Sequence, residues 1–481
     1  MIRFIGRPTS PSASCRSIAV AVVAGLVMVS CSSSSTTAKT TVASATTTAA
    51  TSSSAPSDST AVTTATTAPK GPDLGKFEAI TGVPGVSDKE IKFAVEGTGP
   101  SNPLGYCLLE CYKQGVQAYF DYRNSLGGVN GRKLVISTVV DDELGNTQVK
   151  LLELTSSDNF GIFASPLTYP GYADVAKANV PMYSTVPAAA EANGFKSIFL
   201  PTGTACIACP SRQNVEIAIL AKAHKVGSLG YGISQASKDC VAGHKATFDK
   251  WGPAVGIELA YSNAELPFGL PNGLGPEVTA MKEAGVDFIL TCIDSGGALT
   301  LEQELERQGM GKVVVSLPQG YSDTAFASKN AALLEGDILS PFFHPLEATP
   351  LPSGLSTYVE WMGKGGYAVN DYGIQGWINA DLAVMGILAA GSKFDRASVI
   401  DATNKITNYT AGGIVATVDW TRQHLAPTIA DPVSNAAPKA CAAYVTIIGG
   451  KFKLLGDSAK PFFCFDPKVD KWVDATPTVF G

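Results

Sequence analysis

A regular alternation of short apolar runs with amphipathic stretches constrains the fold of this chain most strongly. Apolar runs typical of buried strands recur from residue 89 onward, and stretches with helical patterning separate them. Strands are expected at 91–97, 133–142, 161–165, 180–185, 226–232, 256–263, 286–294 and 312–320. Helices are expected at 112–128, 147–157, 171–179 and 276–285. This alternation favours βαβ units and parallel sheets, hence an α/β fold.

The strands fall into two series, which the segment 199–211 separates. About 400 residues follow Gly71, more than one hydrophobic core usually holds. Gly285, at the end of one expected helix, is a typical C-cap. The pattern therefore predicts two doubly wound parallel-sheet lobes.

The N-terminus has the layout of an export signal. Its charged residues before Asp58 are all basic, and residues 18–29 are all apolar or Gly. Such a run is too short to span a bilayer as a helix, which needs roughly 20 residues. A basic start, a short apolar run and small residues before a cleavage site are typical of a secretory signal. "MVSC" at its end resembles a bacterial lipobox, which implies a signal peptide at 1–30 and lipidation of Cys31; an ordinary secretion signal is the alternative.

A Ser/Thr/Ala-rich segment, residues 31–74, follows the signal. Such a composition buries too little apolar surface to offset chain entropy, so we expect a disordered tether. The order of anchor, tether and folded body suits a protein that works at the outer face of a bacterial membrane.

The chain lacks the usual signatures of catalysis. No Gly-rich phosphate loop, nucleophile elbow or HExxH motif is present, so no enzyme activity, cofactor or metal site is expected. His224 and His244 are expected on helix surfaces, and the carboxylates at 141–143 in a solvated turn. The net charge of −6 argues against a nucleic-acid partner, which would favour a basic surface.

Cysteine usage indicates disulfides. Eight Cys remain besides Cys15 and Cys31, an even number in a chain with an export signal. Cys206 and Cys209 form a CxxC pair, for which redox chemistry is the alternative. Zinc binding would need a second such pair or nearby His, which the spacing does not provide.

Several segments resemble one family. Residues 125–148, "SLGGVNGRKLVISTVVDDELGNTQ", resemble the region after the first helix of leucine/isoleucine/valine-type periplasmic binding proteins, the type I solute receptors of ABC importers. Residues 177–189, 279–294 and 376–391 are similar to the same family, in the expected order, and 85–97 is similar to the opening of many lipid-anchored members. The resemblance implies two lobes joined by three crossovers. They are expected near 201–204, 340–343 and 418–424, with lobe 1 at 85–201 and 342–420 and lobe 2 at 202–341 and 421–481.

The resemblance also implies a ligand set between the lobes. Ser165 falls where the family grips an α-carboxylate, and Asp294 and Gln319 fall where it holds an ammonium group. The remaining contact positions fall on Tyr106, Val186, Ala188 and Ser237. Because Ala188 lacks the family's hydroxyl and Gln319 is neutral, either Asp294 supplies the missing charge or the ligand is an amide, a carboxylic acid or an aromatic acid. Ordinary αβ-turn chemistry uses the same small polar residues.

Within this frame, the resemblance pairs Cys240 with Cys292, and Cys441 with Cys464 across a C-terminal hairpin. Cys107, Cys111, Cys206 and Cys209 pair either locally or across the lobe boundary. The implied function is a monomeric, lipid-anchored receptor that captures a small amino-acid-like or carboxylic solute by cleft closure and delivers it to an ABC permease. A ligand sensor or surface-interaction protein on the same fold is the alternative.

Overall fold

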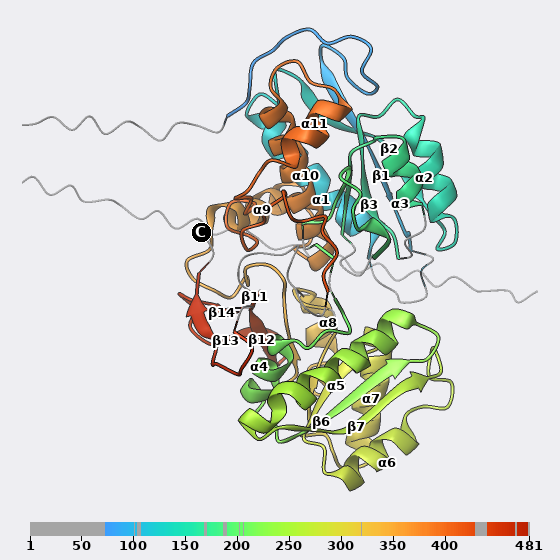
Figure 1. The fold of residues 1–481 in the computed structure, drawn as a ribbon, viewed down its shortest axis with the longest axis vertical. Helices are drawn as coiled ribbons and strands as arrows, with labels where there is room; N and C mark the ends of the chain where they lie inside the picture. Colours follow the sequence, from blue (N-terminus) through green and yellow to red (C-terminus); the bar gives the residue numbers. More distant parts are fainter. Residues whose placement is uncertain are drawn as a thin grey trace, which may run out of the picture. The chain divides into compact units, whose positions relative to one another are not determined.

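Two mainly parallel sheets organise the chain, which we describe from a computed structural model (Figure 1). The structure describes residues 73–100, 102, 107–167, 171–185, 190–201, 203–204, 206–318, 320–428, 440–466 and 469–479. The predicted signal peptide, Cys31 and the tether up to residue 72 lie outside this part of the chain.

The first sheet has the strand order β2-β1-β3-β4-β5, and all of its strands run parallel. Its strands are β1 (Glu90–Gly97), β2 (Lys133–Asp141), β3 (Gly161–Ser165), β4 (Met182–Ser184) and β5 (Ile198–Phe199). Its connections contain α1 (Leu109–Ser125), α2 (Thr147–Thr155), α3 (Tyr172–Lys177) and a short 3-10 turn, Ala190–Ala192. Alternate strand residues face opposite sides. Ala94 and Ile162 therefore pack with α2 and α3, whereas Phe93 and Phe163 pack with α1.

The second sheet repeats this order in its parallel part. From the edge inward it reads β7 (Glu258–Leu266), β6 (Lys225–Tyr231), β8 (Phe288–Cys292), β9 (Val314–Ser316) and β10 (Ile338–Leu339). Helices α4 (Arg212–Leu220) and α5 (Gln235–Val255) share a core with one face, and α6 (Gly275–Ala284) and α7 (Ser295–Arg307) share a core with the other. A short helix, α8 (Thr324–Lys329), follows β9.

The C-terminal part returns to the second sheet. The hairpin of β12 (Tyr444–Ile448) and β13 (Lys451–Leu455) pairs antiparallel with β10. Its turn residues, Gly449 and Gly450, both have positive φ, as a tight two-residue hairpin turn requires. A separate sheet is formed by β11 (Ala440–Ala442), β14 (Phe462–Phe465) and β15 (Thr476–Thr478), and the sequence patterns did not predict it.

Between β10 and the hairpin, three helices pack beside α1 and one another. They are α9 (Ser353–Lys364), α10 (Asp371–Ala390) and α11 (Arg396–Thr403), and α10 packs along α1 (Figure 1). Among the described residues, α10 is the one helix long and apolar enough to cross a membrane, with a mean hydropathy of 1.2. Two-thirds of that window is buried inside the protein, so burial in the core accounts for its composition.

The local predictions agree closely with the structure in type and order, and the mixed α/β fold with two parallel sheets is confirmed. Gly285 ends α6 in the left-handed conformation, as expected of a C-cap. Three surface expectations were wrong. His244 is only 6 % exposed, because the face of α5 that bears it packs on the second sheet. Asp142, expected in a solvated turn, is fully buried. His224 is exposed, but it precedes β6 and does not lie on a helix.

Candidate functional site

The strand order defines where each lobe can bind a ligand. In both parallel sheets the first strand is flanked by the second on one side and the third on the other. Ligands of open α/β sheets bind outside the carboxyl ends of the strands at such a switch point. The first switch point lies where Gly97 of β1 pairs with Ser165 of β3, and the second where Gly230 of β6 pairs with Cys292 of β8.

Ser165 stands at the first switch point. Its side chain is 1 % exposed, and its hydroxyl has no hydrogen-bond partner among the described residues. Gly97 lies directly beside it, since a Cβ on Gly97 would collide with the Ser165 hydroxyl. A buried hydroxyl without a partner costs free energy, which a ligand oxygen or nitrogen at this position would recover.

A buried carboxyl that we did not predict lies one residue before this point. Glu96 is fully buried at the end of β1, and neither of its carboxyl oxygens has a partner among the described residues. Burial raises the pKa of Glu96 well above its ordinary value, and the negative charges of Asp142 and Asp141 raise it further. Both effects favour the protonated form of Glu96, which can donate a hydrogen bond. The sequence signal that could have identified Glu96 is its position as the one acidic residue within the apolar run 91–97.

Asp142 supports the same edge of the sheet. Its carboxylate accepts hydrogen bonds from the hydroxyls of Thr98 (3.0 Å) and Thr147 (2.7 Å), which connect the ends of β1 and β2 to the start of α2. The Thr98 hydroxyl also accepts a hydrogen bond from the backbone N–H of Leu167 at 2.9 Å. The loops after β1, β2 and β3 are thus bonded to one another beside Ser165.

At the second switch point, the two predicted side chains are already engaged. The Ser237 hydroxyl accepts from the backbone N–H of Tyr231 at 2.7 Å and donates to the carbonyl of Cys292. Asp294 is the N-cap of α7 and accepts from the Gly297 N–H at 2.9 Å and from the Tyr231 hydroxyl at 2.6 Å. Both residues therefore orient the ends of β6 and β8. Tyr231, which the sequence patterns did not single out, connects them.

The other predicted ligand residues, Tyr106, Val186, Ala188 and Gln319, lie outside the described residues. Their placement in the site stays a prediction.

Eight cysteines form four disulfides in the structure. Cys240 of α5 is bonded to Cys292 at the end of β8, and Cys441 is bonded to Cys464, which lies opposite it across the β11–β14 pair. The other two bonds are local, between Cys107 and Cys111 and between Cys206 and Cys209. The CxxC pair is therefore present as a closed disulfide.

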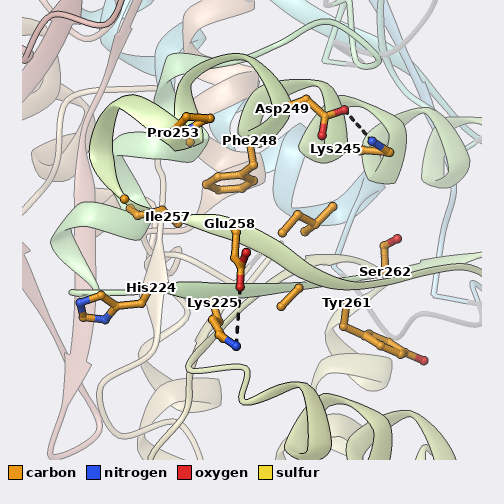
Figure 2. Close-up of a pocket in the computed structure, with 14 residues that line it drawn as sticks. His224, Lys225, Lys245, Phe248, Asp249, Pro253, Ile257, Glu258, Tyr261 and Ser262 are labelled. Atoms are coloured by element: carbon orange, nitrogen blue, oxygen red, sulfur yellow. Dashed lines mark hydrogen bonds and ion pairs between the residues drawn. The ribbon is translucent and has the colours of Figure 1, made fainter.

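A separate groove of about 720 Å³ lies beside β7 and α5 (Figure 2). Ion pairs join Lys225 to Glu258 (3.6 Å) and Lys245 to Asp249 (2.6 Å) within it. It includes the first residues of β6 and β7, hence the amino ends of these strands, and none of the predicted ligand residues. The switch-point rule therefore excludes it as the principal ligand site.

With this geometry established, comparison with known proteins identifies the class. Residues 98–430 match the profile of the periplasmic binding protein family, so the chain belongs to this family. Its members are extracytoplasmic, bind small molecules and work with ABC transporters. The comparison with curated proteins found no match.

Solved structures show the same type I fold. A fatty acid ABC transporter substrate-binding protein from Thermomonospora curvata has a TM-score of 0.60 and 21 % identity, over 84 % of this chain and 100 % of that one. A branched-chain amino acid ABC transporter protein from Thermus thermophilus with bound valine has a TM-score of 0.57 and 16 % identity, over 79 % of this chain and 97 % of that one. A solute-binding protein from R. palustris in complex with 4-hydroxybenzoate has a TM-score of 0.56 and 18 % identity, over 79 % of this chain and 98 % of that one. At these identities the likeness concerns the fold alone.

Proposed function

We propose that this protein is a lipid-anchored, extracytoplasmic receptor that captures a small amino-acid-like or carboxylic solute between its lobes and delivers it to an ABC importer. The unpartnered, buried hydroxyl of Ser165 at the first switch point carries the proposal. A hydroxyl donates readily to a carboxylate, and such charge-assisted hydrogen bonds are stronger than neutral ones.

The solutes named for the three structural neighbours point the same way. Fatty acid, valine and 4-hydroxybenzoate share a carboxylate and differ in everything else. A conserved chemical group on otherwise different ligands is what a single hydroxyl at the switch point would recognise. Recognition of the rest of the ligand, including any ammonium, would come from the loops that carry Asp294 and the predicted Gln319.

A thermal-shift screen of the purified protein against α-amino acids, amides, and aliphatic and aromatic acids tests this proposal. A ligand at 100 times its dissociation constant adds about 2.7 kcal/mol to stability. We expect carboxylates to stabilise the protein and the matched amides to do so much less. Ser165→Ala should weaken binding about tenfold or more, because a hydrogen bond to a charged group contributes about 1.5–3 kcal/mol.

Ser184→Ala is the matched control. Ser184 is also buried at the end of a strand of the first sheet, but its hydroxyl already contacts the Tyr172 hydroxyl at 3.3 Å. This variant should bind carboxylates like the wild type. Equal stabilisation by acids and amides would argue against carboxylate recognition. No stabilisation by any compound would favour the surface-interaction function.

A further inference from the structure

A cluster of sulfur and nitrogen donors lies behind the second switch point. Cys240 and His244 are four residues apart on α5, a spacing that places both on one helix face. Cys292 at the end of β8 completes the cluster, and ligand atoms of the three residues all lie within 4.8 Å of one another. No other such cluster of three or more His, Cys, Asp or Glu occurs in the part of the chain that the structure describes.

His244 is held in position for ligation. Its Nδ1 lies 2.8 Å from the Ser228 hydroxyl on β6, which fixes the ring and leaves Nε2 directed toward Cys240. Metal-binding histidines are commonly oriented by such a hydrogen bond from their second nitrogen.

One of the sulfur–nitrogen distances suits tetrahedral coordination. Cys240 Sγ lies 3.8 Å from Nε2 of His244. Bonds of about 2.3 Å to sulfur and about 2.0 Å to nitrogen would separate these two ligand atoms by about 3.5 Å. Cys292 Sγ lies 3.7 Å from Nδ1, the nitrogen that faces Ser228, so its thiolate would have to move away from Cys240 and toward the Nε2 side of the ring after reduction.

We infer that reduction of the Cys240–Cys292 disulfide creates a Cys2His site for a soft divalent cation of the zinc type. A phosphine reductant breaks the S–S bond to give two thiols and is oxidised to its phosphine oxide, with the oxygen and the two protons supplied by water. The cation then displaces both thiol protons to solvent, so that two thiolates balance its charge. Three protein ligands leave a fourth position open to water.

The cluster is accessible to a small reductant, and it lies close to the predicted ligand residues of the second switch point. Both cysteines are partly exposed, whereas His244 is buried. The carbonyl of Cys292 accepts from Ser237, and Asp294 follows two residues later. The site therefore lies directly behind the residues that shape the lobe-2 side of the proposed cleft, although the inference does not depend on the proposed function.

Titration of the phosphine-reduced full chain with Co²⁺ tests the inference. We expect one ion per chain to give the visible spectrum of tetrahedral cobalt with thiolate ligands, and Zn²⁺ to displace it. The oxidised protein should give no such spectrum. His244→Gln, which keeps a polar side chain of similar size beside Ser228, should weaken Co²⁺ binding at least tenfold and change the spectrum through loss of the nitrogen ligand.

The other reducible cysteines require a control. The same titration in a variant with Cys206→Ser and Cys209→Ser removes the CxxC pair and should leave the tetrahedral spectrum unchanged. Circular dichroism of each reduced variant verifies that it is folded, and Cys240→Ser provides a second test because it removes one ligand without changing His244. Equal Co²⁺ affinity in wild type, His244→Gln and Cys240→Ser, or a spectrum that is lost with the CxxC pair, would overturn the inference.

Discussion

At the residue scale, buried carboxyl groups are the most unusual feature of this protein. Glu302 of α7 and Asp337, just before β10, are both buried, and one carboxyl oxygen of each has no hydrogen-bond partner among the described residues. Asp337 also accepts from the backbone N–H of Val315 at 2.9 Å. Burial raises the pKa of both groups, and the charge of Asp337 raises that of Glu302 further. The pair therefore retains a proton on Glu302 at neutral pH.

This proton makes stability depend on pH. Glu302 keeps its proton in the folded state, whereas the unfolded chain releases it above an ordinary pKa of about 4.3. Stability from this group is fully present below that pH and falls as the pH rises toward the raised folded pKa, by at most about 1.4 kcal/mol per pH unit. Glu302→Gln keeps a donor for Asp337 and has no proton to lose. We expect it to become progressively more stable than the wild type from pH 5 to pH 9.

Urea unfolding at pH 5, 7 and 9 measures this difference. Glu306→Gln, an exposed change on the same helix, serves as the control and should show a nearly constant difference from wild type. A constant difference for Glu302→Gln as well would mean that the pair does not hold its proton in the folded state.

At the element scale, the contact between α1 and α10 depends on glycine. A Cβ on Gly376 of α10 would collide with the carbonyl of Tyr112, and a Cβ on Gly115 of α1 would collide with the carbonyl of Gly373. The two backbones therefore approach closely, and the Asn379 amide donates to the Tyr112 hydroxyl at 2.7 Å beside them. This close approach lets the apolar helix α10 pack tightly against α1 in the protein core.

Gly376→Ala should lower the free energy of unfolding by about 1–3 kcal/mol, because overpacking a close contact forces backbone shifts. Gly363→Ala is the matched control: Gly363 lies in α9, is exposed and has open space where a Cβ would stand. Because Gly363 lies in the last turn of α9, Gly363→Ala should change the stability little, with a gain below the roughly 0.5–1 kcal/mol expected in a helix interior. Denaturant unfolding measures both. Equal effects of the two changes would contradict the close helix contact.

At the scale of the whole molecule, the segments that connect the two sheets bear on how a ligand is held. The chain passes from the first sheet to the second after β5, returns after β10 to helices α9 to α11, which pack beside α1 and one another, and re-enters the second sheet at β12. Segments that pass between sheets in this way can act as hinges for domain closure. We expect a ligand that contacts both lobes to shift the population toward a closed form.

Small-angle X-ray scattering tests this expectation. The radius of gyration should fall when the carboxylate with the largest thermal shift is added, and Ser165→Ala should need a higher concentration for the same change. An unchanged radius at saturating ligand would mean that binding does not close the lobes.

The sequence by itself determined the local elements and their order. The apolar runs predict β1 to β4 and β6 to β9 to within a few residues. A buried parallel strand is a short continuous apolar run, whereas an amphipathic helix is longer and repeats its apolar residues every three or four positions. The sequence also predicted that Gly285 ends a helix, and the structure places it in the left-handed conformation there. The place of Ser165 at the end of β3 follows from the same local pattern.

Only the tertiary structure decided which side chains meet. The Ser237 hydroxyl donates to the carbonyl of Cys292, and His244 contacts Ser228 and both sulfur atoms, so these contacts join residues on different elements. The burial of Glu96 without a partner is likewise a result of tertiary packing. Local patterning carries no information on such contacts, since they depend on how strands β6 and β8 are placed side by side and on which face of α5 covers them. The two-residue strands β5 and β10 escaped prediction for the same reason: pairing with neighbours, rather than their own composition, makes them strands.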